Sequence, residues 1–507
     1  MRSRLALFAA RRPGLAAFAL GLLSAAALPP LHLIPVLFVS LPGLLALIGA
    51  RATWRGAAMM GIWFGTGHHI GGLYWITEAI LIESTAFWWL VPTGVPMLAA
   101  FLALFIAVPC ALARLAPAPA RPLVLAGSWV LVDIGRQFVL SGFPWNPLGS
   151  VWTLPGAAGD TMIQPAAWIS VHGLTLLTLL LALLHRRAAA AVLVAWIAFG
   201  LVRLGPCPVP PSPVTIALIQ GNIAQEGKWE RARAMRIFEH YLALTRTARM
   251  AQPGATLVAP GGTLVAPGGT LVPVWPETAV PFLVDADADA RAAIAAAAGG
   301  TAIVGALRFD AARRPYNSLM AVDGPGPVAA TYDKWHLVPF GEYQPGWFPL
   351  PIAFVSGDGF GRGTGPRTWH LPGLPAVGPL ICYESIFPGQ VVAADRPDWL
   401  VTVTNDAWFG DSAGPRQHLA AARLRAVEEG LPLMRAANTG ISAGFDPYGR
   451  EIGRIGMNRE GILTLALPGK LPPTPFARLG LALPLLLTVA TIAAGLFIAR
   501  QPGRAYK

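Results

Sequence analysis

The chain has 507 residues, of which 54% are hydrophobic and 13% charged, and its formal net charge is +12. Soluble domains carry roughly 25% charged residues, so this composition excludes a disordered chain and argues against a purely soluble enzyme. The basic residues are dispersed among apolar runs instead of forming one stripe, so membrane topology explains them better than nucleic-acid binding does. Three cysteines exclude a disulfide scaffold and a four-thiolate zinc site.

Hydrophobic runs of bilayer-spanning length, roughly 17–25 residues, occur in two parts of the chain. Seven precede residue 210 and an eighth lies near the C-terminus. The predicted spans are 13–29, 31–50, 57–80, 88–113, 121–140, 163–185, 188–204 and 479–499. The first run also fits a cleaved signal peptide, but six further apolar segments follow it without a soluble mature start, which favours a membrane helix.

The placement of arginines predicts an orientation for these spans. If the N-terminus is cytoplasmic, the paired basic residues of every short loop fall on one side, as the positive-inside rule requires. These pairs are Arg11/Arg12, Arg51/Arg55, Arg114/Arg121 and Arg186/Arg187. The sequence therefore predicts a membrane domain at 1–210, an extracytoplasmic domain at 211–470, and a last membrane helix with a cytoplasmic tail at 471–507.

Polar residues interrupt the predicted membrane domain at three places. Asp133 and Arg136 stand three positions apart, so we expect them to pair on one helix face. His68 and His69 are adjacent, so we expect them to point to different helix faces and to make no metal site. Trp145 lies in a loop rich in glycine and proline on the outer side, where it lines a lipid entrance or simply belongs to a turn.

Between residues 211 and 470, short runs rich in β-branched residues alternate with polar helical stretches. The predicted helices are 227–250, 288–298 and 415–430. The predicted strands are 215–220, 270–275, 301–307, 318–322, 377–382, 399–404, 433–436, 440–445 and 462–467. Strands mixed with helices in a segment of this length indicate one α/β domain with its own core.

A seven-residue unit containing Thr-Leu-Val occurs three times before the strand predicted at 270–275. The copies are 254–260, 261–267 and 268–274. The period is too short for a solenoid, so we interpret the repeat as a local expansion that lengthens a loop. Because each copy offers the same apolar run, alternative strand registers are open as well.

Cys382 ends an apolar run and precedes a polar turn. A buried core cysteine fits this pattern, and a disulfide with Cys207 is a further alternative. The position nevertheless favours a nucleophile, because a strand-to-helix elbow exposes a side chain and aims backbone N–H groups at it, which lowers a thiol pKa.

Lys334 and Glu277 are candidate partners of that thiol. Only four of the 38 basic residues are lysines, and Lys334 lies among aromatic and apolar residues, where its ammonium would stabilise an oxyanion or simply snorkel to the surface. Glu277 follows a predicted strand. It is either a general base for the thiol or a carboxylate that is simply exposed to solvent at the strand end. Each of the three residues ends a strand or begins the next loop, and strand ends on one sheet edge gather in space. The sequence contains no Cys/His cluster with ligand spacing and no glycine-rich phosphate loop. We therefore expect neither zinc nor a nucleotide cofactor.

Four motifs follow one another in the predicted extracytoplasmic domain. They are Trp-Pro-Glu at 275–277, Lys334 with His-Leu-Val-Pro-Phe-Gly-Glu at 336–342, Ile-Cys-Tyr-Glu at 381–384 and Asn-Asp-Ala-Trp-Phe-Gly at 405–410. With Gly-Phe-Pro-Trp at 142–145 and the membrane runs, the chain resembles over nearly its whole length the apolipoprotein N-acyltransferases, the membrane-bound branch of the nitrilase superfamily. It departs from the family pattern at the heptapeptide expansion and at Trp335.

The resemblance implies an αββα sandwich with a catalytic triad of Glu277, Lys334 and Cys382. It also implies active-site support by a second group of residues, Trp229, Glu342, Tyr383 and Glu384. A third group is expected to line the substrate entrance: Asn405, Trp408, Phe409 and Trp145.

The implied reaction is acyl transfer in two halves, without a cofactor. Cys382 takes an acyl chain from a phospholipid, expected to be phosphatidylethanolamine, and the α-amine of the diacylglyceryl-cysteine of an apolipoprotein then attacks the thioester. The implied place is the periplasmic side of the bacterial inner membrane. One alternative is a membrane-tethered nitrilase-type amidase that uses water as acceptor, against which the eight spans argue. The other is a scaffold with a decayed nitrilase domain, against which the intact Glu, Lys and Cys argue.

Overall fold

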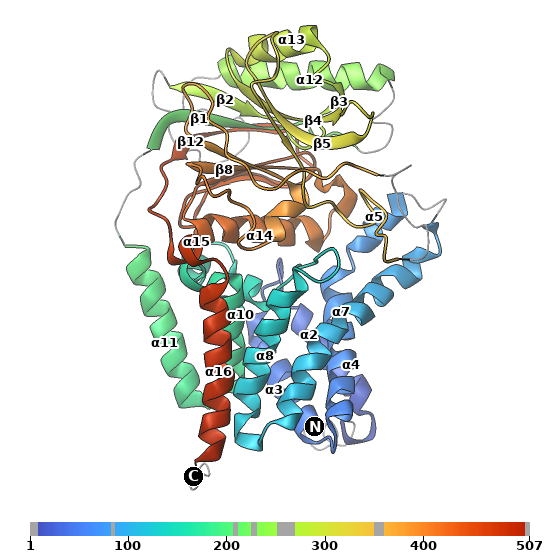
Figure 1. Ribbon diagram of the computed structural model, residues 1–507, viewed down its shortest axis with the longest axis vertical. Helices are drawn as coiled ribbons and strands as arrows, with labels where there is room; N and C mark the ends of the chain where they lie inside the picture. The colour runs from blue at the N-terminus through green and yellow to red at the C-terminus, as the bar shows by residue number, and fades with distance from the viewer. Residues whose placement is uncertain are drawn as a thin grey trace. The chain divides into compact units, whose positions relative to one another are not determined.

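The computed structural model describes residues 9–82, 87–205, 211–224, 231–250, 269–348 and 359–501 (Figure 1). The chain divides into two compact units. We call the first the helical unit; it comprises Met1–Gly205, Ser412–Ala420 and Pro475–Lys507. We call the second the sandwich unit; it comprises Pro206–Asp411 and Ala421–Thr474. No pattern in the sequence singled out the segment 412–420 as part of the helical unit.

The helical unit contains a helix at each of the eight predicted membrane runs. Its α-helices are α2 (Pro13–Ala25), α3 (Leu37–Gly49), α4 (Trp54–Leu73), α5 (Ile76–Ile82), α7 (Leu90–Leu115), α8 (Arg121–Arg136), α9 (Ala157–Met162), α10 (Ala166–Leu183), α11 (Arg186–Arg203), α15 (Pro475–Leu479) and α16 (Ala482–Arg500). Within the described ranges, α7, α10 and α16 are long and apolar enough to cross a bilayer, whereas α2 and the segment Ile34–Gly49 are apolar but shorter. The number of eight spans is therefore not confirmed.

Small residues bring α4 close to its neighbours. Gly61 and Gly65 lie one turn apart and face α7, where a Cβ on either would stand 2.7 Å from the Cα atom of Ala107 or Ala103. Such close approach at small residues is typical of helices that pack inside a membrane. A side chain at either glycine would therefore push α4 and α7 apart.

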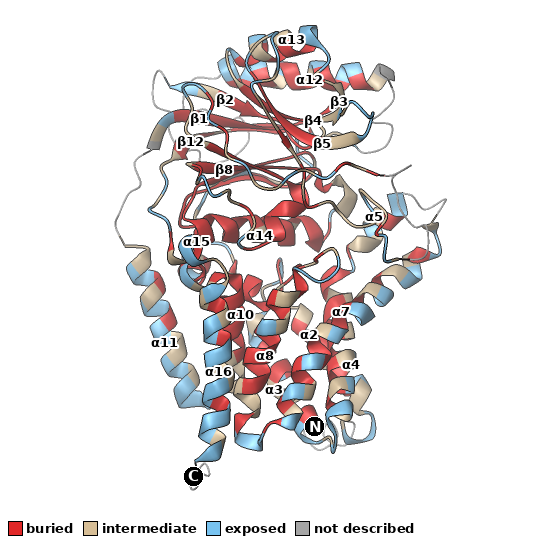
Figure 2. Cartoon of the chain, in the orientation of Figure 1, coloured by how far each residue is buried: buried red, intermediate tan, exposed pale blue. Residues whose placement is uncertain are grey.

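The outward faces of α11 and α16 are exposed and apolar (Figure 2). Leu486 and Phe497 on α16 are 65% and 64% exposed, and Val194 and Leu201 on α11 are also exposed. Contiguous apolar surface of this kind marks a membrane or protein contact, and on these apolar helices it fits a membrane location.

The sandwich unit contains two β-sheets. The seven-stranded sheet has the order β12-β1-β2-β4-β5-β6, with β3 paired to β4, and the five-stranded sheet has the order β11-β10-β9-β8-β7. The strands are β1 (Pro211–Gln220), β2 (Thr270–Val274), β3 (Val280–Leu283), β4 (Ala302–Phe309), β5 (Pro315–Val322), β6 (Ala330–Asp333), β7 (Val377–Ile381), β8 (Trp399–Thr404), β9 (Leu433–Ala437), β10 (Ser442–Phe445), β11 (Glu451–Ile455) and β12 (Gly461–Pro468).

Two apolar cores follow from the alternation of side chains along β1. Ile216 and Leu218 join a core that includes residues of both sheets, whereas Ala217 and Ile219 join a core with the helices α12 (Arg231–Met250) and α13 (Ala288–Ala298). This is the period of two expected for a strand covered on both faces. Figure 1 shows α12 and α13 over the seven-stranded sheet, and residues 421–429 of α14 (Ala413–Glu429), the part that belongs to the sandwich unit, beyond the five-stranded one. The structure thus has the predicted αββα layers of a nitrilase-like fold.

Each of the nine predicted strands is present, and β8 has the predicted bounds. The short strands β3, β6 and β11 were not predicted from the sequence. The third copy of the heptapeptide repeat supplies β2, which pairs in parallel with β1 from Val214–Thr270 to Leu218–Val274. The first two copies lie outside the described residues.

Candidate active site

Glu277, Lys334 and Cys382 converge in the sandwich unit. Glu277 follows β2, Lys334 follows β6 and Cys382 follows β7. The Nζ atom of Lys334 lies 3.2 Å from Oε1 of Glu277, and the charges of both residues act on the pKa of the Cys382 thiol. The expectation of a single sheet edge is wrong, because β7 belongs to the five-stranded sheet and the other two strands to the seven-stranded one.

The Trp-Pro-Glu motif fixes Glu277 through its neighbours. Trp275 is fully buried and donates a 2.9 Å hydrogen bond from Nε1 to Oγ1 of Thr245. On the other side, a Cβ at Gly305 of β4 would collide with the carbonyl oxygen of Pro276. The glycine therefore lets the backbone just before Glu277 lie directly against β4.

Both carboxylate oxygens of Glu277 accept hydrogen bonds. Oε2 accepts the backbone N–H of Asn405 at 2.8 Å, and Oε1 accepts Nδ2 of Asn317 at 2.6 Å besides the Lys334 ammonium. Burial by itself would raise the pKa of Glu277, but the Lys334 charge and these donors outweigh burial and hold the pKa below its ordinary value. Glu277 is therefore a carboxylate at neutral pH, as a general base must be.

Lys334 lies between two carboxylates. Besides Glu277, its Nζ atom contacts Oε1 of Glu342 at 2.9 Å, and Oε2 of Glu342 accepts the backbone N–H of Val338 at 2.8 Å. Burial alone would lower the pKa of Lys334, but the two carboxylates raise it well above its ordinary value. Lys334 is therefore an ammonium group, and Glu342 is a second counter-ion to it.

Asn317 is a further residue of the site, and the sequence did not predict it. Its Nδ2 atom donates to Oε1 of Glu277 at 2.6 Å and to Oε1 of Glu342 at 3.0 Å, so it bridges the same two oxygens as the Lys334 ammonium. It also holds the lysine backbone, because its carbonyl oxygen accepts the N–H of Lys334 at 2.9 Å. The predicted strand began one residue later, at Ser318, and no motif marked the asparagine.

Cys382 stands directly after a strand, as predicted, but a short 3₁₀ turn takes the place of the expected helix. The strand β7 ends at Ile381, and the 3₁₀ turn η4 (Cys382–Ile386) begins at the cysteine, whose φ is +52°. A left-handed backbone is uncommon for a residue other than glycine and occurs preferentially at functional sites.

The expected low pKa of this thiol is wrong. Cys382 is only 7% exposed, and burial raises its pKa well above the ordinary range; the Glu277 charge adds to this, while Lys334 and a hydrogen bond with the Thr404 side chain act in the opposite direction. The sulfur is therefore a thiol at neutral pH. It needs a base at the moment of attack.

Glu384 ties the elbow to the loop that carries Lys334. It is fully buried, and Oε2 accepts the backbone N–H of Ile381 at 2.7 Å and the hydroxyl of Tyr332 at 2.9 Å. Oε1 accepts the backbone N–H of Trp335 at 2.7 Å. Burial raises the pKa of Glu384 to about 7, against the two backbone donors, which lower it. Its neighbour Tyr383 is buried.

The remaining predicted site residues do not all lie in the sandwich unit. Asn405 is buried beside Glu277, and Trp408 and Phe409 are half-buried in the short 3₁₀ turn that follows it. Trp229 lies outside the described residues. Trp145 belongs to the helical unit, where it is buried and donates from Nε1 to Oε1 of Gln417 at 2.9 Å. Its role at an entrance stays a prediction.

Comparison with known proteins identifies two family regions in the chain. A sequence profile described as the apolipoprotein N-acyltransferase N-terminal domain matches residues 20–184, and one described as carbon-nitrogen hydrolase matches residues 215–472. Among solved structures, an amidase from Nesterenkonia sp. is 19% identical with a TM-score of 0.37, covering 52% of this chain and 93% of that chain.

Relatives that match both regions are described as apolipoprotein N-acyltransferases. One from Bradyrhizobium diazoefficiens is 40% identical over 92% of this chain and 91% of its own length, and one from Rhodopseudomonas palustris is 38% identical over 95% and 94%. These matches include the membrane helices, so they favour an acyltransferase over an amidase. The chain therefore belongs to the apolipoprotein N-acyltransferase family, within the carbon-nitrogen hydrolase superfamily.

Proposed function

We propose that Cys382 carries an acyl chain from a phospholipid to the α-amine of the diacylglyceryl-cysteine of apolipoproteins, with Glu277 as general base and Lys334 as oxyanion partner. The observation that carries the proposal is the juxtaposition of an ionised carboxylate, an ammonium group and a buried thiol. Such a set suits nucleophilic acyl transfer, in which a weak nucleophile is activated by an adjacent base.

In the first half-reaction, the Cys382 sulfur attacks the ester carbonyl while Glu277 takes the thiol proton. The carbonyl oxygen becomes an oxyanion, which the Lys334 ammonium stabilises. The C–O bond to the glycerol then breaks, and Glu277 returns the proton to the leaving oxygen. The products are a lysophospholipid and a thioester on Cys382.

In the second half-reaction, the neutral α-amine attacks the thioester carbonyl. Glu277 takes a proton from the nitrogen, Lys334 again stabilises the oxyanion, and the C–S bond breaks as the proton passes to the sulfur. The product is an amide, and the thiol is restored. Glu342 and Asn317 support both halves by holding Lys334 and Glu277 in place.

The thioester has to be protected from water, since hydrolysis would turn the transferase into a hydrolase. We place the lipid-facing wall at Asn405, Trp408 and Phe409, because Asn405 contacts Glu277 and the two half-buried aromatic side chains follow directly. The expected result for Trp408→Ala is faster loss of the thioester to water, measured as free fatty acid released without acceptor. If Trp408→Ala hydrolyses the thioester and performs both half-reactions at wild-type rates, Trp408 does not shield the thioester from water.

We further propose eight membrane spans, with residues 1–210 and 471–507 in the membrane domain and residues 211–470 on the periplasmic side of the bacterial inner membrane. The paired arginines of the short loops and the apolar helices support this topology. Reporter fusions at residue 300 should be active only outside the cytoplasm. A cytoplasmic signal there would reverse the orientation.

A single mass measurement tests the acyl-enzyme. Purified protein is incubated with phosphatidylethanolamine vesicles, and the intact mass should increase by one acyl chain that hydroxylamine removes. The Cys382→Ser variant should stay unmodified, whereas Cys110→Ser, the matched control in α7, should be acylated like the wild type. An unmodified but folded wild type overturns the proposal. Vesicles of phosphatidylglycerol test the headgroup, and a diacylglyceryl-cysteine peptide tests the acceptor.

A further inference from the structure

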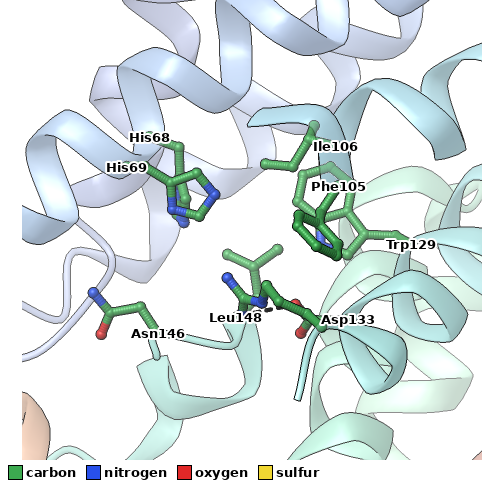
Figure 3. A pocket seen from close by; sticks show the side chains of 9 residues that line it. His68, His69, Phe105, Ile106, Trp129, Asp133, Asn146 and Leu148 are labelled. Atoms are coloured by element: carbon green, nitrogen blue, oxygen red, sulfur yellow. Dashed lines mark ion pairs between the residues drawn. The ribbon is translucent and has the colours of Figure 1, made fainter. Parts of the chain in front are cut away.

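A polar pocket lies inside the helical unit, between α4, α7, α8 and residues 146–148 (Figure 3). Its polar lining consists of His68, His69, Asp133, Arg136 and Asn146. The expectation that the two histidines point apart is wrong: both line this pocket, and their ring centres are 5.2 Å apart. Ionisable residues are costly among apolar helices, so their grouping around one cavity calls for a function.

The ion pair in the pocket is incompletely satisfied. Arg136 Nη2 contacts Asp133 Oδ1 at 2.8 Å, which confirms the predicted pairing, and it also donates to the carbonyl oxygen of Trp145 at 3.1 Å. Both side chains are more than nine-tenths buried. Even so, Asp133 Oδ2 and Arg136 Nε find no hydrogen-bond partner among the described residues. The ion pair thus contains one buried acceptor and one buried donor without a hydrogen bond among the described residues, although buried polar groups are normally hydrogen-bonded.

The hydrogen bonds of Ser24 settle the proton position on His68. The Ser24 hydroxyl donates its one proton to the carbonyl oxygen of Gly21 at 2.6 Å, so its oxygen must accept from Nδ1 of His68 at 2.8 Å. The proton of the neutral ring is therefore on Nδ1. The other ring nitrogen, Nε2, is an acceptor.

The pocket is small and carries no net charge. Its cavity volume is about 10 Å³, and roughly 10–15 Å³ holds one water molecule. A lipid headgroup or a phosphate ion does not fit. The Asp133 carboxylate and the Arg136 guanidinium cancel, so the pocket does not favour an ion over a neutral molecule.

We propose that this pocket is a binding site for one ordered water molecule. The water accepts from Nε of Arg136 and donates to Oδ2 of Asp133 and to Nε2 of His68. Three hydrogen bonds are the usual number for a buried water. Through Arg136, which donates to the carbonyl oxygen of Trp145, the water completes the support of the Trp145 backbone.

A thermodynamic cycle tests the site in the full-length protein in detergent. Ile106 lines the pocket from α7, and Ile106→Phe extends a larger side chain towards the water position. We expect this change to lower the apparent Tm by several degrees, because it leaves the donor and acceptors without partners. The matched control Ile106→Leu should shift the Tm by much less. The double variant Asp133→Leu/Arg136→Met has no ion pair for a water to bind. When Ile106→Phe is added to this double variant, the decrease in Tm should be much smaller than in the wild type.

An equal Tm loss in both backgrounds would mean that Ile106→Phe acts by steric strain alone, and would overturn the proposal. If the double background does not fold, an experimental density map at about 2 Å resolution decides. A peak within hydrogen-bond distance of both Asp133 Oδ2 and Arg136 Nε supports the site. Well-ordered side chains with no peak between them refute it.

Discussion

The amide nitrogen of Asn317 lies 2.6 Å from Oε1 of Glu277, closer than the Lys334 ammonium, which lies 3.2 Å from the same oxygen. Glu277, the proposed general base, is thus oriented by a neutral donor as well as by its ion-pair partner. Because the same Nδ2 atom also contacts Glu342 at 3.0 Å, one side chain fixes the distance between the two carboxylates.

Replacing this asparagine should slow the first half-reaction. Asn317→Leu removes hydrogen bonds to charged groups, which are worth about 1.5–3 kcal/mol each, so we expect acylation of Cys382 by phospholipid to slow by about 10- to 100-fold. The rate is followed by intact mass after rapid mixing. Asn317→Asp should slow it as well, because a third carboxylate beside Glu277 repels the first two. A wild-type rate in the Leu variant would show that Lys334 alone positions the base.

Removing the ammonium should destabilise the sandwich unit through the charges it leaves behind. In Lys334→Met, Glu277 and Glu342 stay buried without a cation, which costs about 3–5 kcal/mol of unfolding free energy. The exposed Lys470, paired with Asp398 at 2.6 Å, is the matched control, and Lys470→Met should cost at most about 1 kcal/mol. Adding Glu277→Gln to Lys334→Met should restore part of the Tm without restoring acylation. No recovery would contradict the charge argument.

The pH dependence of acylation should report Glu277. Its pKa lies below the ordinary glutamate value, so the carboxylate form persists as the pH falls through about 4.3, the usual value. We therefore expect protonation of Glu277 to cause no fall in the acylation rate between neutral pH and that point, for as long as the protein remains folded. In Lys334→Met, burial is no longer opposed by the ammonium, so the residual rate should begin to fall at a higher pH. If the acylation rate of Lys334→Met begins to fall at the same pH as that of the wild type, the group whose protonation stops the reaction is not Glu277.

Acid should destabilise the protein through His336. The imidazole stacks on Phe387 at 3.7 Å and contacts Gln390 through Nε2 at 3.0 Å, and burial lowers the pKa of His336 to about 4. Between pH 4 and about 6.5, the usual value for histidine, His336 therefore binds more protons in the unfolded chain than in the folded one. The contribution of His336 to stability falls as the pH falls through this window.

The test of this acid effect is the Tm measured from pH 7 to 4.5. The Tm of His336→Phe, which keeps an aromatic ring in the stack, should fall less over this range than that of the wild type. His370→Phe, at an exposed histidine, is the control for a surface substitution. Parallel curves for the wild type and His336→Phe would exclude His336 as the cause.

Local patterns predicted much of the fold and pointed to three candidate site residues. The strand β8 was predicted with its bounds, because Trp399–Thr404 is an unbroken run of apolar and β-branched residues between turns. The pairing of Asp133 with Arg136 followed from helix periodicity alone. Glu277, Lys334 and Cys382 were candidates because each ends a strand or begins the next loop, and their grouping as a triad was implied by the resemblance of their motifs to a known family.

What the sequence did not predict depends on contacts between distant segments. The pKa of Cys382 is raised by burial, which a strand-to-helix pattern does not reveal. Asn317 lies inside a strand, and only folding brings it to Glu277, 40 positions earlier in the chain. The assignment of residues 412–420 to the helical unit likewise rests on tertiary contacts, such as that of Gln417 with Trp145.

Two carboxylates and one ammonium group lie near Cys382. This charge balance should affect which acyl compounds the enzyme accepts. With the sulfur protonated, the cluster carries one excess negative charge, so a detached fatty acid would bring its own anion into repulsion with it. Esters and thioesters approach without that penalty. Unesterified fatty acids should thus neither acylate the protein nor inhibit it strongly, and a chain lost to accidental hydrolysis should leave readily.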